Sequence, residues 1–298
     1  MGCMCGKEAV TINSRRFYVR SRLGEGGFSV VDLLEEARTH ALFAMKRITC
    51  HGPADERLAL REVEVMRALR HRHIVPLEEY CQITIGRHDQ SQDTISEVLL
   101  IMPYYKRGSL QEKLDALKRR NERLAEGDIW RVFTGVLQAV QAMHRHDPPY
   151  SHRDIKPGNV MMDDAGEAIL MDLGSASPAR LQVTTRSEAQ ALQDEAAERC
   201  SMLFRPPELF SVEPGASIDE RTDVWSLGCF LYAMAFGESP FEKVYQRGDS
   251  IALAVMSQNV SFPTHSYSVK LEECIRLCLV VNQMERPFIE RVMEAAAL

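Results

Sequence analysis

The chain has 298 residues, of which 45% are hydrophobic and 26% charged, and its formal net charge at pH 7 is -6. This composition is that of an ordinary globular protein, and the length allows one large core or two modest ones. The acidic balance argues against an extended nucleic-acid surface, which needs a basic stripe. No run of about 18 apolar residues is present, so the sequence predicts no membrane-spanning helix.

The first residues form a candidate acylation segment. Loss of the initiator methionine would expose Gly2, whose amine N-myristoylation requires, although the usual pattern has Ser or Thr where this chain has Gly6. Cys3 and Cys5 are suitable acceptors for S-palmitoylation. One myristoyl chain binds membranes only marginally, and a second acyl chain makes the attachment stable. We expect residues 1–11 to be an acylated anchor; the alternative is an unmodified terminus.

The other six cysteines are spread along the chain in apolar or mixed contexts, as is typical of reduced cytosolic thiols. Cys274 and Cys278 lie one helical turn apart. No pair of histidines with zinc-ligand spacing accompanies them, so burial in a helix is the favoured interpretation over metal binding.

A glycine-rich turn is the first candidate phosphate site. It joins two predicted strands, residues 16–23 and 29–34. Glycines allow backbone N–H groups to approach phosphates without a Cβ clash. A Gly-x-Gly by itself is weak evidence, because many hairpins contain one.

The next predicted strand carries Lys46 among apolar residues, where an ammonium group needs an anionic partner. Residues 55–69 have helical periodicity, and Glu62 and Glu64 both lie in this segment. The predicted apolar face of this helix is formed by Leu58, Val65, Met66 and Leu69.

A compact polar run lies near the middle of the chain. Asp154, Lys156 and Asn159 place a carboxylate, an ammonium group and an amide within a few positions, and Asp172 adds a second carboxylate further on. Phosphoryl transfer from ATP needs such a set, because one carboxylate orients the incoming hydroxyl and the other, with the amide, holds Mg²⁺.

These motifs resemble those of the protein kinase family. His152-Arg153-Asp154 through Asn159 is similar to the H-R-D-L-x-x-x-N loop, and Asp172-Leu173-Gly174 is similar to D-F-G. Other family motifs occur in the expected order along the chain. Residues 24–31 resemble G-x-G-x-x-G-x-V, with Ser29 in place of the third glycine, and the V-A-I-K motif ends at Lys46. Pro206-Pro207-Glu208 resembles A-P-E, and residues 223–228 match D-x-W-S-x-G.

The resemblance implies an α+β fold with two lobes. The kinase domain would span residues 12–298, with a small antiparallel-sheet lobe of one helix at 12–102 and a larger, mainly helical lobe at 103–298. ATP would bind between them. The implied reaction transfers the γ-phosphoryl group of ATP to serine or threonine hydroxyls of proteins, including the kinase itself, with Mg²⁺ or Mn²⁺. Lys156 favours serine and threonine, because the tyrosine-specific branch has a different loop.

The resemblance also assigns roles to single residues. Lys46, Glu62, Asp154 and Lys156 would be catalytic, and Asn159 and Asp172 would bind the metal. Leu173, Glu208, Asp223 and Arg286 would be structural, with Asp223 bonded to backbone near Arg153 and Arg286 paired with Glu208. The nucleotide would be bound by Leu23, Gly24, Glu25, Gly26, Gly27, Phe28, Ser29, Val31, Ala44, Lys46, Met102, Pro103, Tyr104, Tyr105 and Met161.

The segment after the metal motif contains a predicted helix. Residues 186–199 are rich in Ala, Gln, Glu and Leu and lack Gly and Pro. This helix, the N-terminus and Leu173 together resemble the Numb-associated kinase branch. The resemblance implies a peripheral, lipid-anchored protein on the cytoplasmic face of membranes, most often the Golgi. Ser201 would bond Asp154 and Lys156, and Thr184 and Thr185 are candidate phosphosites.

Two alternatives stay open at this point. A membrane-anchored pseudokinase scaffold would have lost Lys46, Asp154 or Asp172, and all three are present. A small-molecule kinase is disfavoured by the motifs at residues 205–208 and 223–228. The expected partners are therefore ATP, protein substrates and a membrane surface, with no nucleic acid.

Overall fold

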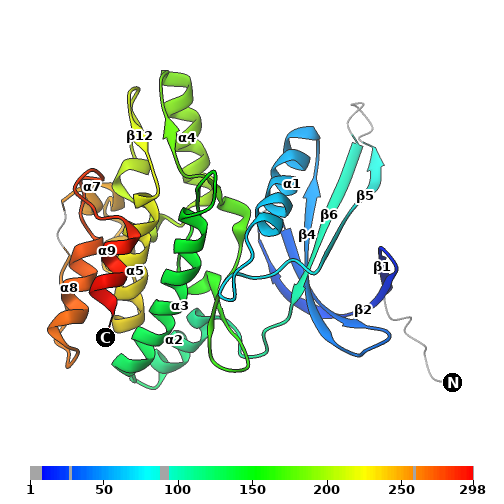
Figure 1. The fold of residues 1–298 in the computed structure, drawn as a ribbon, viewed down its shortest axis with the longest axis horizontal. Helices are drawn as coiled ribbons and strands as arrows, with labels where there is room; N and C mark the ends of the chain where they lie inside the picture. The colour runs from blue at the N-terminus through cyan, green and yellow to red at the C-terminus, as the bar shows by residue number, and fades with distance from the viewer. Residues whose placement is uncertain (1–8, 27–28, 88–93, 258–259, 298) are drawn as a thin grey trace. The chain divides into compact units, whose positions relative to one another are not determined.

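The computed structural model describes residues 9–26, 29–87, 94–257 and 260–297 (Figure 1). Within these ranges the chain forms two compact units. The first comprises the described residues up to Arg70 together with Val75–Tyr105, and the second comprises His71–Ile74 and the described residues from Lys106 onward.

The first unit is an antiparallel sheet with one helix. The sheet has the order β1 (Ala9–Ile12), β2 (Arg15–Glu25), β3 (Ser29–Glu36), β4 (Leu42–Cys50), β6 (Thr94–Pro103) and β5 (Glu79–Arg87). The helix α1 (Pro53–Ala68) begins with Pro53, whose missing N–H costs nothing at a helix start. One face of the sheet carries an apolar core of Ile12, Phe17, Leu34, Met45, Leu99 and Ile101.

Helix α1 corrects one expectation. Leu58, placed on the apolar face by the sequence, is 37% exposed. The other three predicted residues, Val65, Met66 and Leu69, are buried as expected, and Ala59, Glu62 and Val63 complete the buried face. The helical phase is therefore set by a buried carboxylate as well as by apolar residues, and hydrophobic periodicity alone does not reveal such a face.

The second unit is mainly helical and is built around α5 (Arg221–Phe236). Every residue of α5 from Arg221 to Ala235 is buried, which is typical of a helix covered on all sides. Gly228 allows the close approach of its neighbour, because a Cβ there would lie 2.7 Å from the Cβ of Cys278. The helices that accompany α5 are α2 (Leu110–Arg119), α3 (Glu126–His144), α6 (Glu242–Gln246), α7 (Ile251–Met256), α8 (Val269–Cys278) and α9 (Ile289–Ala296).

Short elements of this unit hold the polar motifs. The strand pairs are β7 (Tyr150–Ser151) with β10 (Ser177–Pro178), β8 (Val160–Met162) with β9 (Ala168–Leu170), and β11 (Leu181–Gln182) with β12 (Ser217–Ile218). The 3₁₀ turns are η1 (Pro157–Asn159), η2 (Leu173–Ser175), η3 (Met202–Phe204) and η4 (Pro207–Leu209).

The predicted helix at residues 186–199 is confirmed as α4 (Arg186–Arg199). It begins with a capping box, in which the Thr185 side chain accepts from the Glu188 N–H and the Glu188 side chain bonds back to the cap. Leu192 and Ala196 pack in an apolar cluster with Ile218 of β12, beside which α4 lies (Figure 1). This segment is mostly polar, and it forms a stable helix because its N-terminus is capped and a narrow face of it is buried.

The cysteines in the described part of the chain are free thiols, and Cys274 and Cys278 are buried in α8. Burial raises the pKa of the Cys200 thiol to about 12. At pH 8 the native protein should therefore react with iodoacetamide at Cys200 roughly 10³-fold more slowly than at an ordinary exposed cysteine. Peptide mass spectrometry after timed labelling measures this, with urea-unfolded protein as the control. Equal labelling rates in both states would contradict the buried placement.

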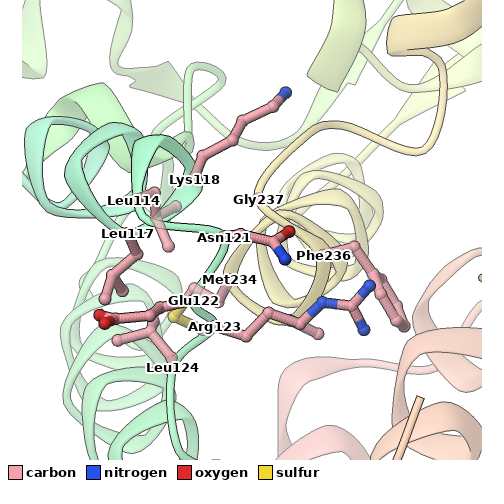
Figure 2. Close-up of a pocket in the computed structure, with 11 residues that line it drawn as sticks. Leu114, Leu117, Lys118, Asn121, Glu122, Arg123, Leu124, Met234, Phe236 and Gly237 are labelled. Carbon is pink, nitrogen blue, oxygen red and sulfur yellow. The ribbon is translucent and has the colours of Figure 1, made fainter.

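A small cavity of about 140 Å³ lies between the end of α2 and the end of α5 (Figure 2). Leu114, Leu117 and Met234 supply apolar walls, and Lys118 and Arg123 supply charges. It contains none of the residues predicted to bind nucleotide or metal.

Candidate active site

Four of the predicted nucleotide-binding residues of the first unit, together with Leu100, share one face of the sheet. Val31 and Leu100 lie directly opposite Lys46 in the neighbouring strands, and Met102 lies opposite Ala44. Side chains of directly opposite residues project to the same face, as do residues two apart along a strand. The sheet therefore presents these five side chains together, on the face opposite the apolar core.

Lys46 forms an ion pair with Glu62 of α1. Its Nζ lies 2.8 Å from Glu62 Oε1 and 2.9 Å from Oε2. Glu62 is only 5% exposed, whereas Glu64 is exposed. A buried carboxylate in this position fixes the place of the lysine ammonium group on this face of the sheet.

The glycine turn and the connector flank this face. The N–H of Gly26 donates to the Ser29 carbonyl at 2.8 Å, which closes the turn between β2 and β3. Gly27 and Phe28, also predicted to bind nucleotide, lie outside the described residues, as do the lipidation candidates Gly2, Cys3 and Cys5. Pro103 ends β6, and the half-buried residues Tyr104 and Tyr105 follow it; Leu23, Gly24 and Glu25 lie at the end of β2, and Met161 lies in β8 of the second unit.

In the second unit, a fully buried carboxylate organises the loop before η1. Asp223 of α5 accepts hydrogen bonds from the N–H groups of His152 and Arg153, both at 2.8 Å. His144 Nε2 lies 2.9 Å from the same carboxylate. Burial acts to raise the pKa of Asp223, but the hydrogen bond with His144, the electrostatic effect of His144 and His152, and the hydrogen bond from the Arg153 N–H outweigh it, and the pKa is lowered. The ionised group therefore holds a loop in which Arg153 has a φ of 66°.

Asp154 stands at the centre of a network of four residues. Its Oδ1 accepts from the Ser201 N–H at 2.8 Å, and its Oδ2 accepts from Asn159 Nδ2 at 2.8 Å. Lys156 Nζ lies 2.8 Å from Asp154 Oδ2 and donates to Ser201 Oγ at 2.6 Å. The arrangement fixes a carboxylate that is 6% exposed and an ammonium group side by side, which suits a hydroxyl and a phosphoryl group that must meet.

The turn that carries Asp172 is bonded to this loop. Met171 N–H donates to the Asn159 carbonyl at 2.8 Å, and His152 Nε2 lies 3.0 Å from the Met171 carbonyl oxygen. Asp172 itself has a left-handed backbone, with φ 58° and ψ 71°, and Leu173 is 1% exposed. The paired strands β8 and β9 and the bond from Met171 to Asn159 therefore hold the two predicted metal ligands, Asn159 and Asp172, close to each other.

The donor set of these two residues fits Mg²⁺. Asn159 uses its amide nitrogen to bond Asp154, so its amide oxygen is the atom that would coordinate a metal ion. Carboxylate and amide oxygens are hard donors, and Mg²⁺ usually takes one or two of them with phosphate oxygens and water. In the described ranges no group of three or more His, Cys, Asp or Glu side chains is arranged to hold a metal. A closed protein cage is therefore absent from these ranges, and a site shared with phosphates is the one that the residues support.

A buried ion pair anchors the segment after α4. Arg286 donates to both carboxylate oxygens of Glu208, at 2.7 and 2.9 Å, and its side chain is 0% exposed.

The exposed Thr184 and Thr185 both donate to Glu188 at the start of α4, so these two candidate phosphosites also take part in capping.

Comparison with known proteins identifies the family. Residues 17–296 match the model of the protein kinase domain. The chain belongs to the protein kinase family. The kinase is 41% identical to serine/threonine-protein kinase 16 of Homo sapiens over 288 residues, which cover 96% of this chain and 91% of the relative. It is 32% identical to serine/threonine-protein kinase ppk13 of Schizosaccharomyces pombe, over 94% of this chain and 89% of the relative.

Family membership confirms the predicted α+β kinase fold, with a sheet-rich unit and a helical unit. Sequence reasoning did not find three contributors to the kinase's polar networks: His144 beside Asp223, and Arg199 and Ser175, which bond across the segment after Asp172. Nothing in their local sequence singles them out. The capping box, by contrast, follows the sequence pattern Thr-x-x-Glu at Thr185 and Glu188 and could have been predicted from the sequence.

Proposed function

We propose that this kinase transfers the γ-phosphoryl group of Mg-ATP to serine and threonine hydroxyls of proteins. The network of Asp154, Lys156, Asn159 and Ser201 supports this most directly, because it fixes a base, a cation and a metal ligand within hydrogen-bond distance of one another. The relatives at 41% and 32% identity carry the name serine/threonine-protein kinase, which agrees with the proposal.

The chemistry follows from the positions of the side chains. Asp154 would accept a hydrogen bond from the substrate hydroxyl and take its proton as the hydroxyl oxygen bonds to the γ-phosphorus, while the bond from that phosphorus to the bridging oxygen breaks and ADP leaves. Lys156 would stabilise the charge on the transferring group, and Lys46, oriented by Glu62, would hold the other phosphates of the same nucleotide. Bound Mg²⁺ supplies neutralisation of phosphate charge. Catalysis would then come from positioning and electrostatics rather than from a covalent intermediate.

A peptide library tests the acceptor. Three sets of peptides, identical except for Ser, Thr or Tyr at the centre, are incubated with the purified kinase and Mg-ATP carrying a labelled γ-phosphate. Label is expected on the serine and threonine sets and in the protein itself, and it should disappear when EDTA removes the metal. Transfer to tyrosine alone, or no transfer to any set, would contradict the proposal.

We further infer that the kinase is held at a membrane by acyl chains on Gly2 and on Cys3 or Cys5, on the cytoplasmic face of the Golgi. The motif at the N-terminus and the family resemblance support this. Among the residues that the structure describes, no helix is long and apolar enough to cross a bilayer. In cells, Gly2→Ala should move most of the protein from the membrane fraction to the cytosol, and an unchanged distribution would contradict the inference.

A further inference from the structure

The last residue of α4 contacts the turn that follows Asp172. Arg199 Nη1 donates to the Gly174 carbonyl oxygen at 3.0 Å, and Ser175 Oγ donates to the Arg199 carbonyl oxygen at 2.9 Å. The two bonds run in opposite directions between segments about 25 residues apart in sequence. We refer to Arg199, Gly174 and Ser175 as the Arg199 clasp.

On the helix side, the clasp rests on a fixed support. Arg205 Nη2 donates to the carbonyl oxygens of Cys200, at 2.9 Å, and Ala197, at 3.3 Å. A cation in this position satisfies carbonyls that the end of a helix leaves unpaired and complements the helix dipole. Arg205 also lies over the Phe210 ring, at 4.9 Å from its centroid. The end of α4 is therefore anchored independently of the clasp.

On the other side, the clasp holds a backbone that needs support. Asp172 has left-handed φ and ψ values, which are unfavourable for a residue other than glycine and persist only when the surroundings enforce them. Leu173 is buried and secures one side of this turn. The bonds to Gly174 and Ser175 secure the residues immediately after it.

We propose that Arg199 is a positioning residue that presents Asp172 to Mg²⁺ through the clasp. This inference rests on the metal role of Asp172 in the proposed function. It makes α4 a built-in support for the metal turn, supplied by a helix that the sequence itself caps at Thr185 and anchors at Arg205. The metal turn is then held by contacts already present in the unmodified chain.

The test compares Arg199→Ala with Arg186→Ala, which removes the same side chain from the exposed first turn of the same helix. Calorimetry measures ADP binding at a series of MgCl₂ concentrations. Supporting groups behind metal ligands typically change metal affinity about 10- to 100-fold. We expect Arg199→Ala to raise the half-saturating Mg²⁺ concentration about 10-fold, with ADP binding in EDTA unchanged. Arg199→Lys, which keeps a donor for Gly174, should restore part of the loss.

Hydrogen exchange supplies a readout that does not depend on metal or turnover. Peptides covering residues 172–176 should exchange faster in Arg199→Ala than in Arg186→Ala, while peptides from α5 remain unchanged. If Arg199→Ala does not fold, Ser175→Ala removes the other bond and should shift both readouts in the same direction. Equal Mg²⁺ dependence and equal exchange in the Arg199 and Arg186 variants would overturn the inference.

Failure of the proposed function gives a different pattern. If the wild-type protein transfers no phosphate, but Arg199→Ala weakens Mg²⁺-dependent ADP binding as described above, the inference about Arg199 holds and the proposed enzymatic function does not. If the wild-type protein is active, but Arg199→Ala does not change its Mg²⁺ dependence, the proposed function holds and the inference about Arg199 does not.

Discussion

Asp154→Ala is expected to lower the turnover number at least 100-fold while leaving ADP binding within a few-fold of the wild type. Loss of a general base typically costs about 10²- to 10⁴-fold. The carboxylate also holds Lys156 at 2.8 Å and accepts from Asn159, so its removal also frees the cation and the amide that act on the phosphate and the metal. Steady-state peptide phosphorylation measures the effect.

Two further variants make the Asp154 result interpretable. Asp154→Asn keeps the shape of the side chain and its acceptor for the Ser201 N–H but loses the charge, so it should fold normally and be nearly as slow. Asp164→Ala removes an exposed carboxylate from the turn between β8 and β9 and should leave turnover unchanged. Near-normal turnover in both Asp154 variants would remove this residue from the catalytic role.

Arg286→Ala is expected to lower the free energy of unfolding by about 3–5 kcal/mol, the usual cost of breaking a buried ion pair from one side. The Arg286 side chain is 0% exposed, and besides Glu208 it donates to the carbonyl oxygens of Val280, Val281 and Arg221. Truncation would leave the Glu208 carboxylate, 12% exposed, without its partner. Three backbone acceptors would lose their donor at the same time.

Urea unfolding of the wild type and two variants measures this difference. The control is Arg291→Ala, because Arg291 and Glu294 form a pair in which both side chains are mostly exposed, and its loss should cost less than about 1 kcal/mol. An Arg286→Ala protein that unfolds at the same urea concentration as the Arg291 variant would show that the buried pair contributes no stability.

The features that the sequence predicts well are local or are tied to a motif. The helix at residues 186–199 follows from its composition, and the Lys46 partner is narrowed to Glu62 or Glu64 by helical spacing, with the motif favouring Glu62. Which of the two is buried depends on the phase of α1 against the sheet. The same phase exposes Leu58, which hydrophobic periodicity places inside.

Long-range polar contacts are the part that sequence alone does not supply. Arg199 reaches Gly174 only because α4 ends where Arg205 and the apolar cluster of Leu192 and Ala196 place it. The contact between His144 and Asp223 likewise depends on the packing of α3 against α5. No spacing rule connects such residues, because their separation in sequence is set by loops rather than by a helical or strand period.

A crystal structure with a non-hydrolysable ATP analogue and Mg²⁺ tests the central claim most directly. We predict that Lys46 Nζ contacts a phosphate oxygen, and that oxygens of Asn159 and Asp172 lie about 2.0–2.1 Å from a metal ion that also binds the phosphates. Asp154 should lie near the terminal phosphate without coordinating the metal. An analogue bound elsewhere, or a metal ion without Asn159 and Asp172 among its ligands, would contradict the proposed function.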